Sequence, residues 1–297
     1  MNLDVLQEWV GRERRVTAVL AVETANLLAA TLDRPPAFRA GDRLPPAWHW
    51  LYFHEATRAS QLGLEGHAQL GGFMPPVSFG GPEPPRRMWA GGELHFQRPL
   101  LLGETATQRS TIRSITPKEG RSGRLVFVVV SHEISVAGEV RLSEEQTIVY
   151  REPVAEAGGG GEAPSAPAGG EFGVEYRPDP ILLFRYSALT FNAHRIHYDV
   201  DYCRQQEGYP DLVVHGPLTA TLLLDLFYHQ FPEQELARFS YRGISPLFNP
   251  HPFTVNGRAN GEAWATSHDG HLAMRAQIQF ADPSGSPTRR VGQPLSG

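Results

Sequence analysis

The chain has 297 residues, a formal net charge of −5 and 41% hydrophobic side chains. Its length predicts two domains, because domains commonly hold about 100–200 residues. The mildly acidic charge, without a long basic run, argues against binding to nucleic acid or an anionic membrane, since both require clustered cations. The single cysteine, Cys203, excludes an internal disulfide framework and suits a reducing cytosol.

The amino-terminal residues resemble neither a signal peptide nor a membrane anchor. Residues 1–4 have no basic region and no apolar region behind it. The apolar stretch 16–32 is interrupted by Glu23 and Asn26, so it falls short of the roughly 20 apolar residues that a spanning helix needs. We therefore expect a globular, cytoplasmic protein.

The first half begins with helical periodicity. Apolar residues recur at helical spacing over residues 5–32, which predicts one or two helices, and Pro35 and Pro36 end this pattern. A second helix is predicted over residues 48–62, where Trp48 and Trp50 form an aromatic start.

After a stretch rich in glycine and proline (71–85), the pattern changes to strands. We expect four antiparallel strands, at residues 94–101, 105–115, 125–135 and 142–150. The third is so continuously apolar that it should be central, with structure on both sides. Residues 153–171 are rich in Gly, Ala and Pro, and their composition is typical of a flexible linker between two domains.

The second half repeats this order of elements. Irregular sequence leads to residues 216–228, a helix that is apolar almost all round and must be enclosed by other structure. Strands are then expected at residues 236–245, 253–260, 262–268 and 271–281. A helix followed by a meander of strands, twice over, indicates a structural duplication, with units at 1–152 and 172–283 and a frayed tail at 284–297.

Polar residues are concentrated at residues 184–199 and 208–218, beside this apolar helix. His194 and His197, with Asp199 or Asp201, could bind a metal ion, since histidines three apart share a helical face. No third or fourth ligand has a recognisable spacing, however. Alternatively, these side chains are ordinary polar residues at a turn.

The residues also carry a family resemblance. The segment Asn192-x-His194-x-Ile196-His197 resembles the Asp-x-Asn-Pro-x-His motif of the MaoC-like (R)-specific enoyl-CoA hydratases. Residues 214–220 resemble the start of that family's central "hot dog" helix. Longer strings, including Arg87-Met88-Trp89-Ala90-Gly91-Gly92, resemble the two-module hydroxyacyl-thioester dehydratases of the mitochondrial type, a group that includes mesaconyl-C4-CoA hydratase.

The resemblance implies an α+β fold of two hot-dog modules, each a helix wrapped by an antiparallel sheet. It also implies reversible hydration of an enoyl thioester, on CoA or an acyl-carrier protein, with a short branched or dicarboxylic substrate such as mesaconyl-C4-CoA. His197 would be the base, because the pKa of histidine lies near neutrality. Gly216 would offer its backbone N–H to the thioester oxygen at the positive end of a helix.

Asn192 departs from the family's Asp. Since an amide cannot exchange a proton near neutral pH, we expect Asn192 to hold the water and not to act as an acid or base. His194 is an alternative proton donor. Arg185 and Arg195 would bind the phosphates of CoA or a substrate carboxylate, and His215 would line the substrate site.

No metal or redox cofactor is implied, and a homo-oligomer is left open. The first half, with its Trp48 and Trp50, looks like a non-catalytic module that accommodates the acyl group. Two other functions remain compatible with the residues: a hot-dog thioesterase, and a scaffold whose site is disabled by the change to Asn192.

Overall fold

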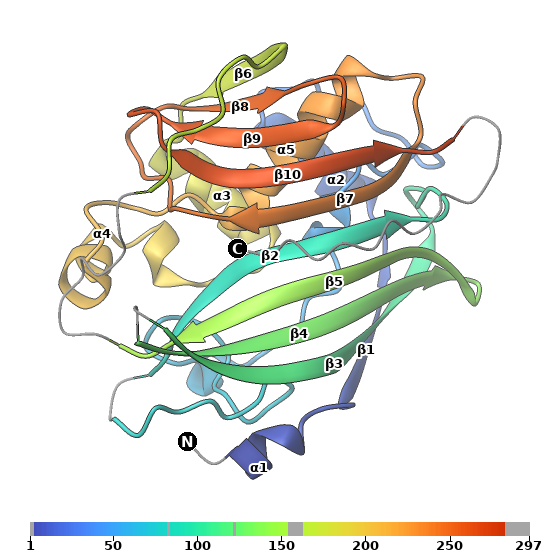
Figure 1. The fold of residues 1–297 in the computed structure, drawn as a ribbon. Coiled ribbons are helices and arrows are strands. Elements are labelled where there is room, and N and C mark those ends of the chain that lie inside the picture. Colours follow the sequence, from blue (N-terminus) through green and yellow to red (C-terminus); the bar gives the residue numbers. More distant parts are fainter. Residues whose placement is uncertain (1–2, 82–83, 121–122, 154–162, 283–297) are drawn as a thin grey trace.

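The computed structural model describes residues 3–81, 84–120, 123–153 and 163–282. Their strands form one antiparallel ten-stranded sheet in the order β1-β3-β4-β5-β2-β7-β10-β9-β8-β6, to which each half of the chain contributes five neighbouring strands (Figure 1). No helix in these ranges is long and apolar enough to cross a membrane.

The first half contains two helices, two short 3-10 turns and five strands. They are α1 (Leu3–Gln7), β1 (Glu13–Val19), α2 (Val22–Thr31), η1 (Trp48–Leu51), η2 (Ala59–Gln61), β2 (Arg86–Phe96), β3 (Thr105–Gly120), β4 (Gly123–Val136) and β5 (Glu139–Arg151). The strands predicted at 105–115, 125–135 and 142–150 are confirmed and are longer than expected. The strand predicted at 94–101 is displaced, because β2 spans Arg86–Phe96 and ends before residue 97. β4 pairs with β3 on one side and β5 on the other, as its apolar sequence indicated.

The helix expected over residues 48–62 is wrong. Only the short 3-10 turns η1 and η2 form there, and between them Phe53 has a φ of +61°, outside the right-handed helical region. Trp48 and Leu51 are buried in the core, while the indole N–H of Trp50 donates to the carboxylate of Glu144. These aromatic residues therefore pack in different directions, and their helical spacing does not produce a helix.

The second half is built around one long helix. Its elements are β6 (Phe172–Tyr176), α3 (Pro180–Leu189), η3 (Arg195–His197), α4 (Val200–Tyr202), the π-helical turn η4 (Cys203–Glu207), α5 (Gly216–Gln230), β7 (Leu236–Gly243), β8 (Phe253–Gly257), β9 (Glu262–Ser267) and β10 (Leu272–Phe280). The helix and strands β7–β10 are confirmed. β6 and α3 arise from residues that we expected to be irregular.

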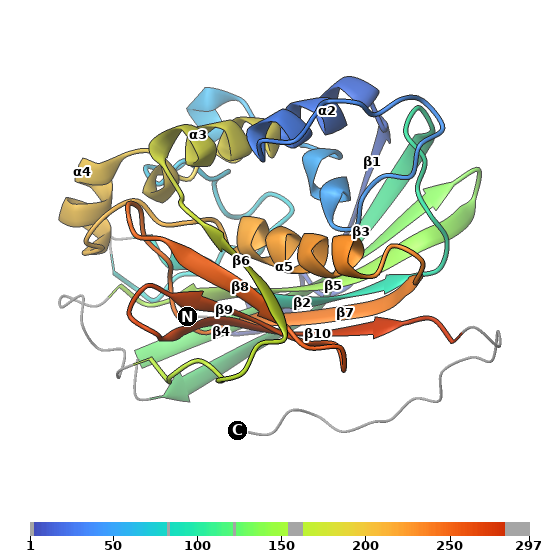
Figure 2. The same ribbon diagram turned by 90° about the horizontal axis from the view of Figure 1, so that it is seen from above.

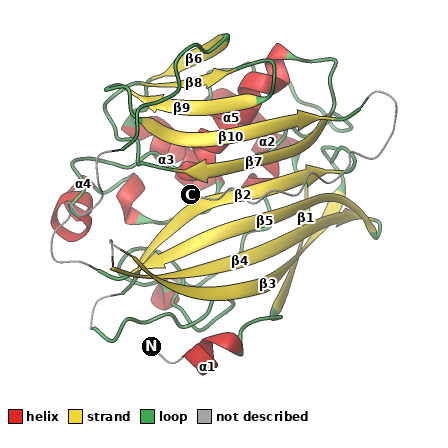
Figure 3. Cartoon of the chain, viewed as in Figure 1, coloured by secondary structure: helices red, strands yellow, loops and turns green. Residues whose placement is uncertain are grey.

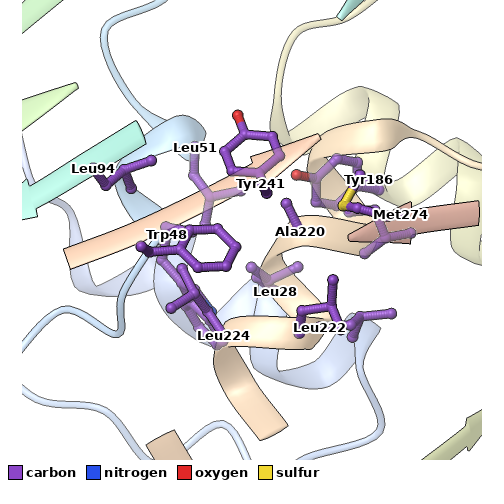
Figure 4. Packing of buried hydrophobic residues seen from close by; sticks show 14 of the residues in the cluster. Leu28, Trp48, Leu51, Leu94, Tyr186, Ala220, Leu222, Leu224, Tyr241 and Met274 are labelled. Carbon is purple, nitrogen blue, oxygen red and sulfur yellow. The ribbon is translucent and has the colours of Figure 1, made fainter. Parts of the chain in front are cut away.

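α5 is enclosed as its composition required. Leu218, Leu222, Leu223 and Phe227 have no exposed surface. The helix lies against the concave face of the sheet, and α2 and α3 lie on its far side (Figures 2 and 3). Residues from both halves fill this core, with Trp48 and Leu94 packed near Leu224 and Tyr241 (Figure 4). The α+β, double hot-dog architecture is confirmed, with the long helix in the second module only.

The two modules meet where β2 pairs with β7. Gly91 is required at this joint, since a Cβ there would lie 2.5 Å from the carbonyl oxygen of Tyr241. Of the predicted linker, residues 154–162 lie outside the described residues, as do residue 283 and the whole predicted tail, 284–297. Residues 163–171 run along the second module instead of hanging free: Ala166 N–H donates to Gly270 O, and Pro164 O accepts from Leu272 N–H.

Candidate active site

Helix α3 and the turn after it position the polar motif. The Asp179 side chain caps α3 by accepting from Leu182 N–H, and Pro180 occupies the first helical position. The chain reverses at Phe191, whose φ is +49°. The Asn192 Oδ1 atom then accepts from the backbone N–H of His194 at 3.1 Å. This turn brings His194 and His197 to the amino-terminal end of α5.

His197 is buried and held in one orientation. Its Nδ1 atom lies 2.8 Å from the carbonyl oxygen of Val213, so Nδ1 carries the proton and donates it. No described residue forms a hydrogen bond with Nε2, and this atom is not completely buried. Burial lowers the pKa of His197 to about 4, against an opposing effect of the Val213 bond. His197 is therefore neutral at pH 7, with an unprotonated Nε2 that can accept a proton.

His215 packs against one face of the His197 ring. The two rings stack with centroids 3.6 Å apart and planes 18° from parallel. His215 has no exposed surface, and its Nε2 lies 2.8 Å from Ser187 Oγ. His215 therefore packs behind His197 in this structure, and its predicted contact with substrate stays a prediction. Ser187 has no part in the sequence motif, and a lone serine in a helix gives no sequence signal of such a role.

Gly216 stands at the first turn of α5, next to the stacked rings. No described residue accepts a hydrogen bond from its N–H, as is usual at a helix start. Pro217 follows and has no N–H of its own. The Gly216 amide is thus a free donor at the positive end of a 15-residue helix, where developing negative charge is stabilised.

His194 lies on the other side of His197, with ring centroids 5.6 Å apart. A residue of the first module, His67, packs against it at 4.3 Å. Burial, His197 and Arg87 lower the pKa of His194 to about 3, so it is also neutral. Sequence reasoning missed His67, because it comes from a distant loop with no periodic pattern.

The loop that carries His67 docks closely on the motif. Gly66 has a φ of +95°, and a Cβ there would lie 1.8 Å from Ala193 O, so only glycine fits. Arg195 secures the same contact: its backbone N–H donates to Glu65 O, and its guanidinium reaches Leu64 O. The active-site region is therefore built from both modules.

The two arginines predicted to bind substrate have different surroundings. Arg195 forms an ion pair with Asp199 at 2.7 Å and lies over the ring of Tyr202 at 4.4 Å. These contacts show Arg195 fastening the loop, and its predicted role in binding substrate stays a prediction. Arg185 is exposed on α3, two residues before Ser187 and hence on the opposite side of the helix. The structure does not bring Arg185 to the histidines.

The metal alternative lacks a ligand set. Within the described part of the chain, no three His, Cys, Asp or Glu side chains converge so that they could hold a metal ion. Asp199, one of the suggested ligands, is engaged by Arg195 and by the N–H of Tyr202.

Comparison with known proteins identifies the family. The model of hydroxyacyl-thioester dehydratase type 2 matches residues 47–249. This chain belongs to that family. It is 43% identical to mesaconyl-C(4)-CoA hydratase of Chloroflexus aurantiacus over 92% of this chain and 96% of that one. It is 30% identical to the mitochondrial hydroxyacyl-thioester dehydratase type 2 of Schizosaccharomyces pombe, over 74% of this chain and 80% of that one.

Solved structures agree on the fold. HtdX of Mycobacterium tuberculosis superposes with a TM-score of 0.61 at 19% identity, covering 90% of this chain and all of that one. A MaoC-like dehydratase from Phytophthora capsici has the same TM-score at 15% identity, over 95% and 99% of the two chains. This member of the type 2 dehydratase family is a hydro-lyase that hydrates or dehydrates acyl thioesters, which decides against the thioesterase and the disabled scaffold.

Proposed function

We propose that this chain hydrates a short enoyl-CoA whose acyl group carries a free carboxylate, with mesaconyl-C4-CoA as the leading substrate. The observation that carries this proposal is the 43% identity to a mesaconyl-C(4)-CoA hydratase over nearly the full length of both chains. The site supports it, because a neutral imidazole and a free helix amide are the two groups that hydration of an enoyl thioester requires.

The reaction follows from the geometry of His197. Its Nε2 takes a proton from a water molecule as that water's oxygen bonds to Cβ of the enoyl group. The electrons of the C=C bond move toward the thioester carbonyl, and the N–H of Gly216 stabilises the negative oxygen that forms. The proton then returns to Cα, which gives the 3-hydroxyacyl thioester.

Two residues assist in this proposal. Asn192 uses its Oδ1 for the turn, so its amide N–H groups remain to orient the water. His194 is the second candidate for returning the proton to Cα, being next to His197. These steps use side chains and one backbone amide alone, and we propose no resident metal or redox cofactor.

The test uses the purified protein with mesaconyl-C4-CoA and with crotonyl-CoA. Hydration removes the enoyl-thioester absorbance without releasing free thiol, whereas hydrolysis releases thiol. The proposal expects the first result with mesaconyl-C4-CoA. Thiol release, or no change with either substrate at micromolar enzyme, would overturn it. Parallel reactions with the acyl-carrier-protein thioesters test the preference for CoA, which the proposal expects to be the better carrier.

A further inference from the structure

A cavity of about 450 Å³ lies in the first module, between the inner face of its sheet and the segment that replaces a long helix there. Val130 and His132 of β4, with Gln146 and Ile148 of β5, form its floor. Residues 55–57 and 68–74 form its cover. The floor is half polar, which is unusual for a pocket that would hold a hydrocarbon chain.

The polar residues of the floor are held in place by neighbouring strands. His132 lies 2.8 Å from Ser110 Oγ through Nδ1 and 3.2 Å from Gln146 Oε1 through Nε2. His132 and Gln146 are each 9% exposed. Since Gln146 uses its Oε1 for this bond, its amide N–H groups remain available to an acceptor in the cavity.

Two arginines line the cavity, and they differ in their partners. Arg14 forms an ion pair with Glu55. Arg87, on β2, is half-buried and forms no ion pair and no side-chain hydrogen bond with any described residue. A guanidinium in such a place, with five N–H donors and no acceptor, is suited to bind an anion.

A second unpartnered group lies beside Arg87. Tyr150 is its cross-strand partner in the sheet, so both side chains are on the same face. Tyr150 is 1% exposed, and its hydroxyl has no hydrogen-bond partner. Glu65 lies near Tyr150 and forms no ion pair with Arg87. A buried hydroxyl without a partner is costly, and an acceptor bound at Arg87 would satisfy it.

The cavity adjoins the histidines. Arg87 is close enough to His67 and His194 to lower the pKa of both, and Ala68, the neighbour of His67, lines the cavity. In mesaconyl-C4-CoA the free carboxylate is attached directly to Cβ, the carbon to which water adds. A carboxylate held at this end of the cavity therefore places Cβ toward the His194 and His197 pair.

We infer that Arg87 binds the free carboxylate of a dicarboxylic acyl group, with Tyr150 as a neutral donor beside it, and so selects such substrates. This inference rests on the proposed function and adds the residue that discriminates among enoyl thioesters. It also places substrate selection in the first module, while the base and the oxyanion donor belong to the second.

The test compares kcat/KM for mesaconyl-C4-CoA and for crotonyl-CoA, which has no carboxylate, in wild type and in Arg87→Gln. Losing one partner of a desolvated charge pair predicts a fall of roughly 30-fold or more for mesaconyl-C4-CoA. Crotonyl-CoA should change less than about threefold, which also shows that the variant is folded. Arg98→Gln removes the same charge from an exposed ion pair with Glu139 and should leave both values unchanged.

Several results would overturn the inference. In Arg87→Gln, an equal fall with both substrates would make Arg87 a general or structural residue, and no fall would exclude it. If Arg87→Gln does not fold, Arg87→Lys, which keeps the charge without the planar fork, should lose several-fold with mesaconyl-C4-CoA alone. Wild type that hydrates crotonyl-CoA as well as mesaconyl-C4-CoA contradicts selection by Arg87 yet leaves hydration intact. Wild type that hydrates neither overturns the proposed function itself.

Discussion

Two substitutions of His197 separate its proposed role as the base from its structural role. Asparagine places its amide Nδ2 where histidine has Nδ1, so His197→Asn keeps the donor to Val213 O but has no basic nitrogen at the position of Nε2. Alanine removes both. The two variants therefore share the loss of the base and differ in the hydrogen bond.

The expected sizes follow from these contacts. General-base catalysis contributes about 10²–10⁴-fold, so both variants should lose kcat by that factor. His197→Ala also leaves the buried Val213 carbonyl without a donor, which costs about 1–3 kcal/mol, and removes the ring stacked on His215, worth about 0.5–1.5 kcal/mol. At about 2 °C per kcal/mol for a chain of this size, its Tm should fall by roughly 3–9 °C.

The assay pairs turnover of mesaconyl-C4-CoA with thermal unfolding. We expect His197→Asn to lose activity while keeping its Tm within about 4 °C of wild type, because it loses only the ring stack with His215. Near wild-type kcat in His197→Asn would refute the role of Nε2. A fall in activity that tracks Tm across both variants would instead make His197 a structural residue.

Three further predictions concern the surroundings of His197. Because burial lowers the pKa of His197 to about 4, kcat/KM should be level from pH 8 to pH 6 and should fall tenfold per unit only below about pH 4; a half-loss near pH 6.5 would indicate an ordinary, exposed imidazole. Ser187→Ala leaves the enclosed Nε2 of His215 without its hydrogen-bond partner, so the free energy of unfolding in urea should fall by about 1–3 kcal/mol. An unchanged unfolding midpoint would show that this hydrogen bond does not stabilise the fold. In Gly216→Ala the new methyl group would lie 3.6 Å from Trp89 O, which is an ordinary contact, so Tm should change little. The methyl group would hinder the approach of the thioester to the amide, so kcat/KM should fall tenfold or more. Unaltered kinetics would show that the Gly216 amide does not contact the thioester.

The sequence predicted the helix that is enclosed by protein and the strands that have at least one buried face. Strands β7–β10 and helix α5 have strong apolar patterns because their positions are buried. The two missed strands, β1 and β6, are the outer edges of the sheet, where one side of the backbone has no neighbour. Their faces are half-exposed, so few apolar residues mark them, and pairing with β3 and β8 determines their structure.

The site was predictable only where a short stretch of chain carries it. His197 and Gly216 were named from a local motif. The ion pair of Arg195 was not foreseen, although Asp199 stands four residues later, at the spacing of a helical ion pair. His67 and Arg87 come from a loop and a strand far from that motif, and Ser187 comes from the helix that precedes it. Their meeting depends on tertiary packing, which no spacing in the sequence records.

The two modules differ in whether a long helix covers the concave face of the sheet, and this difference explains which groups each module contributes to the candidate site. The second module fills its concave face with α5, and the start of that helix supplies the Gly216 amide and the His215 platform. The first module has no such helix, so part of its sheet remains free to form the wall of a cavity. A duplicated fold without the second long helix thus leaves a cavity in the first module without changing the strand order. Arg87, His132 and Gln146 line this cavity together with aliphatic residues, so under the inference above it suits a charged acyl group better than a long hydrocarbon chain.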